Sequence, residues 1–155
     1  MLRLSKKADY ALIAMKHLAQ RPDGASASAR EIAEAYDIPL ELLAKVLQRL
    51  VRARLLVSVQ GTRGGYRLGR PAHAIPVVDV IQGVDGPVTV TACSTDDHNC
   101  DQFSKCSIRD PLWKIRSRIV DALNTVSVAE LAVDEAPPAE PVRSVSRMTL
   151  LLPND

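Results

Sequence analysis

The stretch from residue 28 to residue 54 decides the fold, and it reads SAREIAEAYDIPLELLAKVLQRLVRAR. Ser28 and Glu31 have the spacing of a capping box, in which the serine hydroxyl accepts from the Glu31 amide and the glutamate carboxylate reaches back. This spacing predicts a short helix from Ser28 to about Tyr36. Asp37-Ile38-Pro39 then forms a tight break, and the proline suits the first turn of a new helix.

The helix after this break is expected to continue to about Ala53 and to be amphipathic. Its apolar residues recur at positions i, i+3, i+4 and i+7, which places them on one buried stripe: Leu43, Val46, Leu47 and Leu50. The opposite face carries Glu41, Lys45, Gln48, Arg49 and Arg52. A short helix, a short break and a second amphipathic helix together predict a helix-turn-helix.

The segments on either side complete a winged helix. Ser5–Gln20 has a helical pattern, in which apolar residues recur at Leu12, Met15, Leu18 and Ala19. Two strand-like runs, Leu55–Gln60 and Gly65–Leu68, follow the helix-turn-helix, and the glycines between them allow the positive φ angles of a hairpin. A further short helix is expected over Pro76–Val84. The fold class is therefore predicted to be mainly α, with a winged helix-turn-helix domain over residues 1–85.

Charge is distributed unevenly along the chain. Residues 1–80 hold 13 Lys/Arg and 7 Asp/Glu, a formal charge of +6, whereas residues 81–155 hold 7 and 11, a formal charge of −4. No acidic residue lies between Glu41 and Asp79, where seven basic residues fall on the second helix and the wing. This placement favours double-stranded DNA as a partner over an ordinary solvated face. The candidate DNA-binding residues are Lys6, Ser28, Arg30, Leu40, Glu41, Lys45, Gln48, Arg49, Gln60 and Arg63.

The only three cysteines are Cys93, Cys100 and Cys106, which lie in a polar loop without periodicity. Such a loop has little to bury, so a bound metal or cluster would be needed to order it. Thiolate sulfur is preferred by zinc and by iron–sulfur clusters. The short paired gaps of zinc ribbons are absent, and the wide gaps favour an iron–sulfur cluster over zinc or over cysteines without a ligand role.

A second long helical pattern begins at Asp110, after the cysteine loop. Its apolar stripe is formed by Leu112, Ile115, Ile119, Ala122, Leu123 and Val126. This helix could pack on its own domain or on a second copy, and we favour a homodimer because helix-turn-helix proteins usually bind two half-sites. The expected units after the winged domain are a cysteine loop over 86–109, a dimerisation helix over 110–133 and a disordered acidic, proline-rich tail over 134–155.

The sequence also argues against several classes of protein. It has no signal-peptide pattern and no apolar run long enough to span a bilayer, so we expect a cytoplasmic protein without a membrane partner. We expect no structural disulfide in that reducing compartment. No cysteine has a nearby motif with a paired base, which argues against an enzyme and against a small-molecule substrate.

These motifs together resemble a known family. The wing pattern Gly61-x-x-Gly64-Gly65-Tyr66, the three-cysteine loop, the opening LRLSKKADYAL and the Asp85-Gly86-Pro87 lead into the cysteines are similar to those of IscR- and NsrR-type iron–sulfur regulators. The similarity covers residues 1–132 and is greatest to regulators of the SUF iron–sulfur assembly operon. It implies a homodimer with crossing long helices, a cluster held by Cys93, Cys100 and Cys106, and promoter recognition by the helix after Pro39.

Two departures from the family pattern matter. Arg109 stands where IscR-type proteins have a histidine ligand three residues after the last cysteine, and arginine cannot ligate iron. Asp9 matches an aspartate that completes the cluster from the partner subunit in NsrR-type proteins, so Asp9 is the expected fourth ligand. The cysteine gaps leave two-iron and four-iron clusters both open. In the wing, Gln60 replaces the usual basic residue, and Arg63 is the candidate for the minor groove.

The function expected from the sequence is that of a transcriptional regulator. Its operator affinity would be switched by the iron–sulfur cluster, and it would control iron–sulfur assembly or stress genes. The alternative is a zinc-bound or metal-free winged-helix repressor that senses thiol oxidation or nitric oxide.

Overall fold

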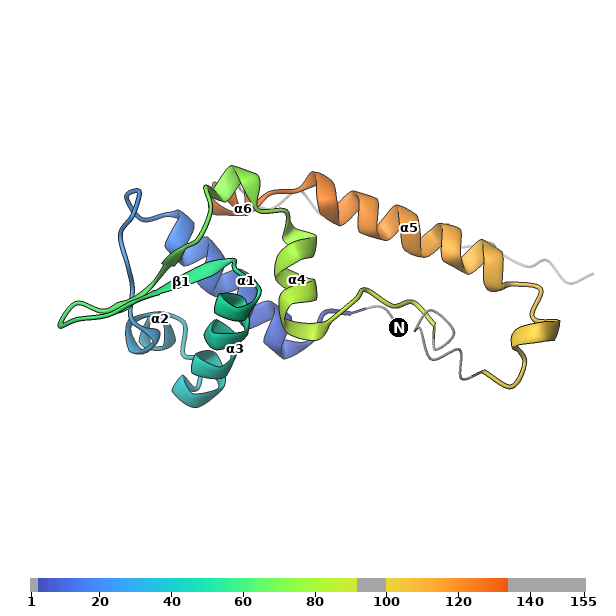
Figure 1. The fold of residues 1–155 in the computed structure, drawn as a ribbon, viewed down its shortest axis with the longest axis horizontal. Helices are drawn as coiled ribbons and strands as arrows, with labels where there is room; N and C mark the ends of the chain where they lie inside the picture. The colour runs from blue at the N-terminus through green and yellow to red at the C-terminus, as the bar shows by residue number, and fades with distance from the viewer. Residues whose placement is uncertain (1–2, 92–99, 134–155) are drawn as a thin grey trace, which may run out of the picture.

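The computed structural model describes residues 3–91 and 100–133, which form a winged domain with a long helical arm (Figure 1). Cys93 and the predicted tail over 134–155 lie outside the described residues. The elements, in chain order, are α1 (Lys6–Ala19), α2 (Ala29–Ala35), α3 (Leu40–Arg52), β1 (Leu56–Val59), β2 (Gly65–Leu68), η1 (Ala72–Ala74), α4 (Val77–Asp85), η3 (Phe103–Lys105), α5 (Arg109–Thr125) and α6 (Val128–Ala132). The predicted class, mainly α with a winged helix-turn-helix, is confirmed.

The core of the winged domain is built on the inner stripe of α3. The four predicted residues of this stripe are at most 2% exposed: Leu43, Val46, Leu47 and Leu50. Burial of such a side chain contributes roughly 1.5–3 kcal/mol relative to leaving it in water. The charged face of α3 is thereby fixed toward solvent.

Helix α1 meets this core with small side chains. Ala8, Ala11 and Ala14 are fully buried, as is Met15, whereas Leu12, one of the apolar residues whose spacing predicted this helix, is only partly buried. Alanine has little side chain beyond Cβ, so it lets neighbouring helix backbones approach closely. Hydrophobic periodicity gives small alanines little weight, so the sequence pattern did not show that they form the buried face of α1.

The helix-turn-helix forms as its capping box predicts. The Ser28 hydroxyl accepts from the Glu31 amide at 3.1 Å, and the Ser28 amide donates to the Glu31 carboxylate at 3.4 Å. Arg21 pairs with the same carboxylate and holds the turn between α1 and α2. Asp37 occupies the break with a φ of +52°, a conformation that Asp tolerates better than most residues.

His17 and Tyr36 join α1 to the end of α2. Their rings meet edge to face with centroids 5.6 Å apart, and His17 Nδ1 lies 3.2 Å from the Tyr36 hydroxyl. Burial of the imidazole, followed by the positive charge of Arg21, lowers the pKa of His17, and Glu31 opposes this only in part. The neutral form of the imidazole is therefore the one that suits this contact.

The wing is a two-stranded antiparallel hairpin that pairs Leu56 with Leu68 and Val59 with Gly65. It is joined to the turn before α2, because the Ala27 amide donates to the Tyr66 carbonyl at 3.0 Å and the Tyr66 amide donates to the Ala27 carbonyl at 2.8 Å. The wing and the helix-turn-helix are thus one hydrogen-bonded unit.

Helix α6 returns the chain to the winged domain. The Val77 amide donates to the Val126 carbonyl at 2.8 Å, and the Val128 amide donates to the Ile75 carbonyl at 2.9 Å. Val128 is fully buried beside α1. Ser127 and Glu130 form a second capping box, and these hydrogen bonds lower the pKa of Glu130. The last helical turn expected over Ser127–Val133 is therefore present.

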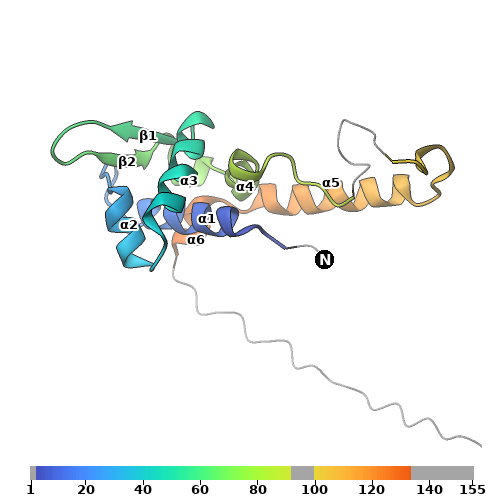
Figure 2. The ribbon, with the colours of Figure 1, turned by 90° about the horizontal axis from the view of Figure 1, so that it is seen from below.

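Helix α5 extends away from the winged domain, at the end opposite the wing (Figures 1 and 2). None of its residues is buried in the described chain, and Trp113 and Ile115 are 46% and 45% exposed. We call the segment over residues 100–125 the arm. The described residues cover its predicted apolar stripe only in part.

No helix in the described ranges is long and apolar enough to cross a membrane.

Replacing Gly65 by alanine is expected to destabilise the wing. An added Cβ would lie 2.4 Å from the Ala27 carbonyl oxygen, and φ at Gly65 is +155°. The expected loss in the free energy of unfolding is about 1–3 kcal/mol, measured by urea denaturation. Gly24→Ala is the matched control, because its φ is +79° but no heavy atom lies within 4 Å of the added Cβ. Equal losses in the two variants would show that the contact with Ala27 does not matter.

Candidate nucleic-acid interface and cysteine segment

The outer face of α3 presents polar side chains to solvent. Glu41, Lys45 and Gln48 are all exposed, and no hydrogen bond or ion pair within the described residues engages their side chains. Leu40, the first residue of α3, is 37% exposed on the same open side. A carboxylate, an ammonium and an amide in this position can accept from or donate to base edges in a major groove.

Arg49, another predicted DNA-binding residue, has a partner inside the chain. Its Nη1 donates to the carbonyl oxygen of Val84, at the end of α4, at 2.5 Å. Arg52, one turn further along α3, is exposed and makes no side-chain hydrogen bond or ion pair with the part of the chain that the structure describes. The two arginines therefore differ in what their guanidinium groups are free to contact.

The predicted DNA-binding residues at the starts of α1 and α2 differ in whether their side chains are already used within the chain. The Ser28 hydroxyl is used as the cap of α2, whereas Arg30 in the first turn of α2 is exposed. Lys6 lies 3.9 Å from Asp9 across one turn of α1, with side chains that are 82% and 42% exposed. A surface pair of this kind contributes little to stability, so both side chains are available for other partners.

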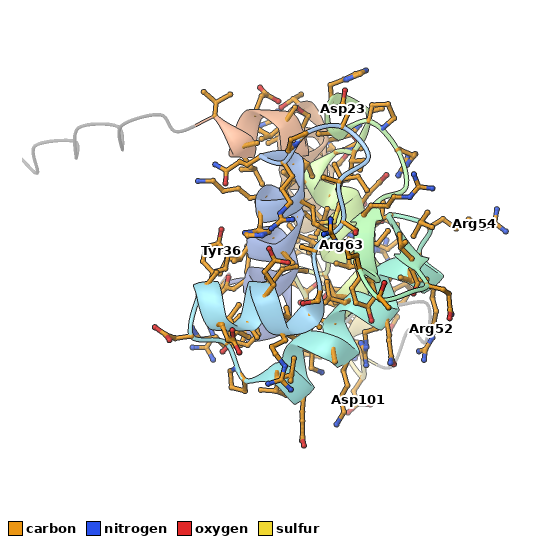
Figure 3. All side chains as sticks on the ribbon, turned by 90° about the vertical axis from the view of Figure 1, so that its left-hand side faces the viewer. Asp23, Tyr36, Arg52, Arg54, Arg63 and Asp101 are labelled. Atoms are coloured by element: carbon orange, nitrogen blue, oxygen red, sulfur yellow. The ribbon has the colours of Figure 1, made fainter. Side chains whose placement is uncertain are left out.

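The loop of the wing, between β1 and β2, carries Gln60 and Arg63, which are both exposed. The Ser26 hydroxyl donates to the Arg63 carbonyl at 3.3 Å, so the backbone of this loop is held while the guanidinium is not. Figure 3 shows Arg63 on the wing, and Arg52 and Arg54 projecting outward from one edge of the domain. Basic side chains thus surround the open face of α3.

The described cysteines lie at the far end of the arm. Cys100 and Cys106 are free and partly buried, and they lie on either side of the short helix η3. The Phe103 amide donates to the Cys100 carbonyl at 3.0 Å. Within residues 3–91 and 100–133, no group of three His, Cys, Asp or Glu side chains lies together as a metal site. The third predicted ligand, Cys93, lies outside the described residues.

Arg109 holds the turn between these two cysteines. Its guanidinium lies over the Phe103 ring, 4.7 Å from the centroid, and its Nη1 donates to the Phe103 carbonyl at 3.5 Å. A cation over an aromatic face contributes about 0.5–1 kcal/mol at an exposed site. The sequence identified Arg109 only as a residue that cannot ligate iron. The only sign of this contact in the sequence is that Arg109 lies six residues after Phe103, the one phenylalanine of the chain.

Comparison with known proteins places this geometry in a family. Residues 4–134 match the Rrf2 family, described as iron-dependent transcriptional regulator. The HTH-type transcriptional regulator IscR of Vibrio cholerae is 35% identical over 134 residues, which cover 86% of this chain and 76% of that protein.

Solved structures agree with this assignment. The oxidized form of CymR from Staphylococcus aureus matches with a TM-score of 0.67 and 28% identity, covering 86% of this chain and 100% of that one. IscR of T. potens matches with a TM-score of 0.65 and 27% identity, covering 84% and 85%.

A winged helix with a charged, open recognition helix defines a DNA-binding transcriptional regulator. The chain belongs to the Rrf2 family and is similar to IscR. The predictions of a transcriptional regulator rather than an enzyme, and of an IscR- or NsrR-type protein, are thus confirmed. The individual contacts to DNA and to a cluster stay predictions.

Lys45→Gln and Arg63→Gln are each expected to weaken binding to operator DNA and to flatten its dependence on salt. Each phosphate contact that is lost reduces the slope of log affinity against log salt by about 0.9. Fluorescence anisotropy at several salt concentrations measures both quantities. Lys114→Gln, a change of the same charge on α5, should leave the slope as in the wild type. An unchanged slope in all three variants would exclude phosphate contacts at Lys45 and Arg63.

Proposed function

We propose that this regulator binds operator DNA with an affinity that is switched by an iron–sulfur cluster held in its cysteine loop. The observation that carries the proposal is the pair of free, partly buried thiols, Cys100 and Cys106, on either side of one short helix. Cys93 would supply the third thiolate. The target genes are proposed to be those of iron–sulfur assembly or stress, on the basis of the similarity to IscR.

The donor set fits an iron–sulfur cluster. Free thiols are soft ligands, and the residues between Cys100 and Cys106 include one large apolar side chain, Phe103, which Arg109 already covers. A bound cluster would supply a centre that is sensitive to oxidation and to small reactive molecules. Cys93, Cys100 and Cys106 would hold it, and the order of residues 100–106 would then depend on whether it is bound.

The fourth ligand is proposed to be Asp9 of the partner subunit. Within one chain, Asp9 lies near the start of α1 and contacts only the exposed Lys6 among the ion pairs of the described residues. The Asp9 side chain is 42% exposed, and its ion pair with Lys6 is on the surface. The carboxylate is therefore accessible to a second chain. Arg109 is excluded, because a guanidinium is always protonated and has no free lone pair for a metal.

The arm is proposed to be the dimer interface. Trp113 and Ile115 on α5 are 46% and 45% exposed in the described chain, which is unfavourable unless a partner covers them. An apolar pocket of about 440 Å³ continues this surface between the start of the chain, the end of α4 and α5. It is lined by residues that include Leu4, Ile81, Pro87, Ile119 and Leu123. A second copy of α5 is the occupant that fits both surfaces.

Alanine at Cys93, Cys100 or Cys106 is expected to abolish the visible absorption and most of the iron of protein purified without oxygen. Each change removes a thiolate that the cluster requires. Asp9→Asn should retain the three thiolates but lose iron faster on dilution. Ser104→Ala, between two of the cysteines, is the control and should retain a full complement of iron. Operator affinity should differ between the loaded and cluster-free wild type; equal affinities would refute the switch.

Ile115→Glu is expected to convert a dimer into a monomer, because it places a charge on the apolar stripe of α5. Ser117→Glu adds the same charge on the opposite side of the helix and should remain dimeric. Sedimentation velocity at micromolar concentration measures the difference. A wild-type protein that sediments as a monomer would overturn the assignment of the interface.

A second candidate is a thiol-redox sensor without iron. The match to the oxidized form of CymR and the two free thiols favour it. A colourless protein that contains zinc or no metal, and whose DNA affinity changes on mild oxidation, would establish this function in place of the first.

A further inference from the structure

The segment between α4 and the cysteine loop is held by side chains from three different elements. We call residues 84–88 the exit segment. Arg49 of α3 donates to the Val84 carbonyl at 2.5 Å, the Ser5 hydroxyl donates to the Asp85 carboxylate at 2.6 Å, and Arg116 Nε of α5 donates to the Val88 carbonyl at 2.7 Å. The exit segment is therefore where the recognition helix, the start of α1 and the arm meet.

The contact of Arg49 has a clear physical basis. Val84 is in the last turn of α4, where carbonyl groups have no amide of their own helix to accept from. A guanidinium satisfies such a carbonyl and also complements the partial negative charge at the end of the helix. The hydrogen bond is partly buried, which strengthens it relative to one in water.

Close packing at the same place joins α4 to the end of α3. A Cβ at Gly83 would lie 3.1 Å from Ala53 Cβ and 3.4 Å from Leu55 Cδ1, so the backbone of α4 is close against the end of α3. A displacement of the exit segment would therefore reach α3 through Arg49 and through this contact. The exposed face of α3 is the one that carries Glu41, Lys45 and Gln48.

We propose that Arg49 is a positioning residue that transmits the state of the cysteine loop to the recognition helix, and that it is not a phosphate contact. This inference rests on the proposed cluster switch. It reassigns one residue of the predicted DNA-binding set, because the hydrogen bond to the Val84 carbonyl directs the guanidinium toward the end of α4. Arg52, which has the same charge on the same helix, contacts no part of the described chain in this way.

The test compares Arg49→Gln with Arg52→Gln, which removes the same charge from the same helix. For each variant, operator affinity is measured for the cluster-loaded and cluster-free protein over a range of salt concentrations. Arg49→Gln should reduce the ratio of the two dissociation constants by at least about fivefold, the low end of ordinary allosteric coupling, and should keep the wild-type salt slope. Arg52→Gln should keep the wild-type ratio. Arg49→Lys retains the charge and a donor, and should restore part of the ratio.

Two outcomes overturn the inference while the cluster switch stands. In the first, Arg49→Gln keeps the wild-type ratio. In the second, its salt slope falls by about 0.9 for each bound chain, as expected when each chain loses one phosphate contact. Thermal unfolding of each variant shows whether it is folded, and the Arg49→Lys protein supplies the comparison if Arg49→Gln is not.

Hydrogen exchange of the cluster-free protein separates this inference from the proposed function. If the wild type binds DNA equally well with and without the cluster, the switch fails, and exchange then decides the role of Arg49. Amides of residues 85–91 should exchange faster in Arg49→Gln than in Arg52→Gln. Equal exchange in the two variants would overturn the mechanical link itself.

Discussion

Burial of the inner stripe of α3 is the constraint on which the rest of the molecule depends. Leu43 and Leu47 are inaccessible to solvent, and they can be so only if α1, α2 and α4 close around one side of the helix. This leaves the opposite side, with its carboxylate, ammonium and amide groups, facing outward. Apolar burial thus orients the polar face of α3 that is proposed to read DNA, although the buried residues themselves lie on the other side of the helix.

The same core determines how the arm is supported. Backbone hydrogen bonds between residues 75–77 and 126–128 bring the end of α5 back to the start of α4. The arm is therefore held at its base, while its outer end carries Cys100 and Cys106 far from the wing (Figure 2). Within one chain, a change at the cysteines can reach α3 along α5 or through the exit segment.

The sequence predicted those features that a local pattern can encode. Three local patterns each predicted the structure of the few residues around them. They are the capping box at Ser28, the period of the α3 stripe and the glycines of the wing. The buried face of α1 was harder, because Ala8, Ala11 and Ala14 owe their burial to neighbouring helices. The partner of Arg49 could not be predicted from the sequence. A pattern shows on which face of a helix a residue lies, but it does not show which carbonyl 35 positions away that residue contacts. Cluster ligation by Asp9 depends on a second chain and is likewise beyond any single-chain pattern.

The pairing of Pro76 with Ser127 has a consequence for how such regulators can diversify. The chain between them first forms α4, which packs in the core, and then the arm, which contributes no residue to the core cluster and returns to the same point. We therefore expect that the length and side chains of the outer arm can change without disturbing the fold at its base. One DNA-reading scaffold can in this way be paired with different sensors, provided that each keeps the exit segment by which α3 is held.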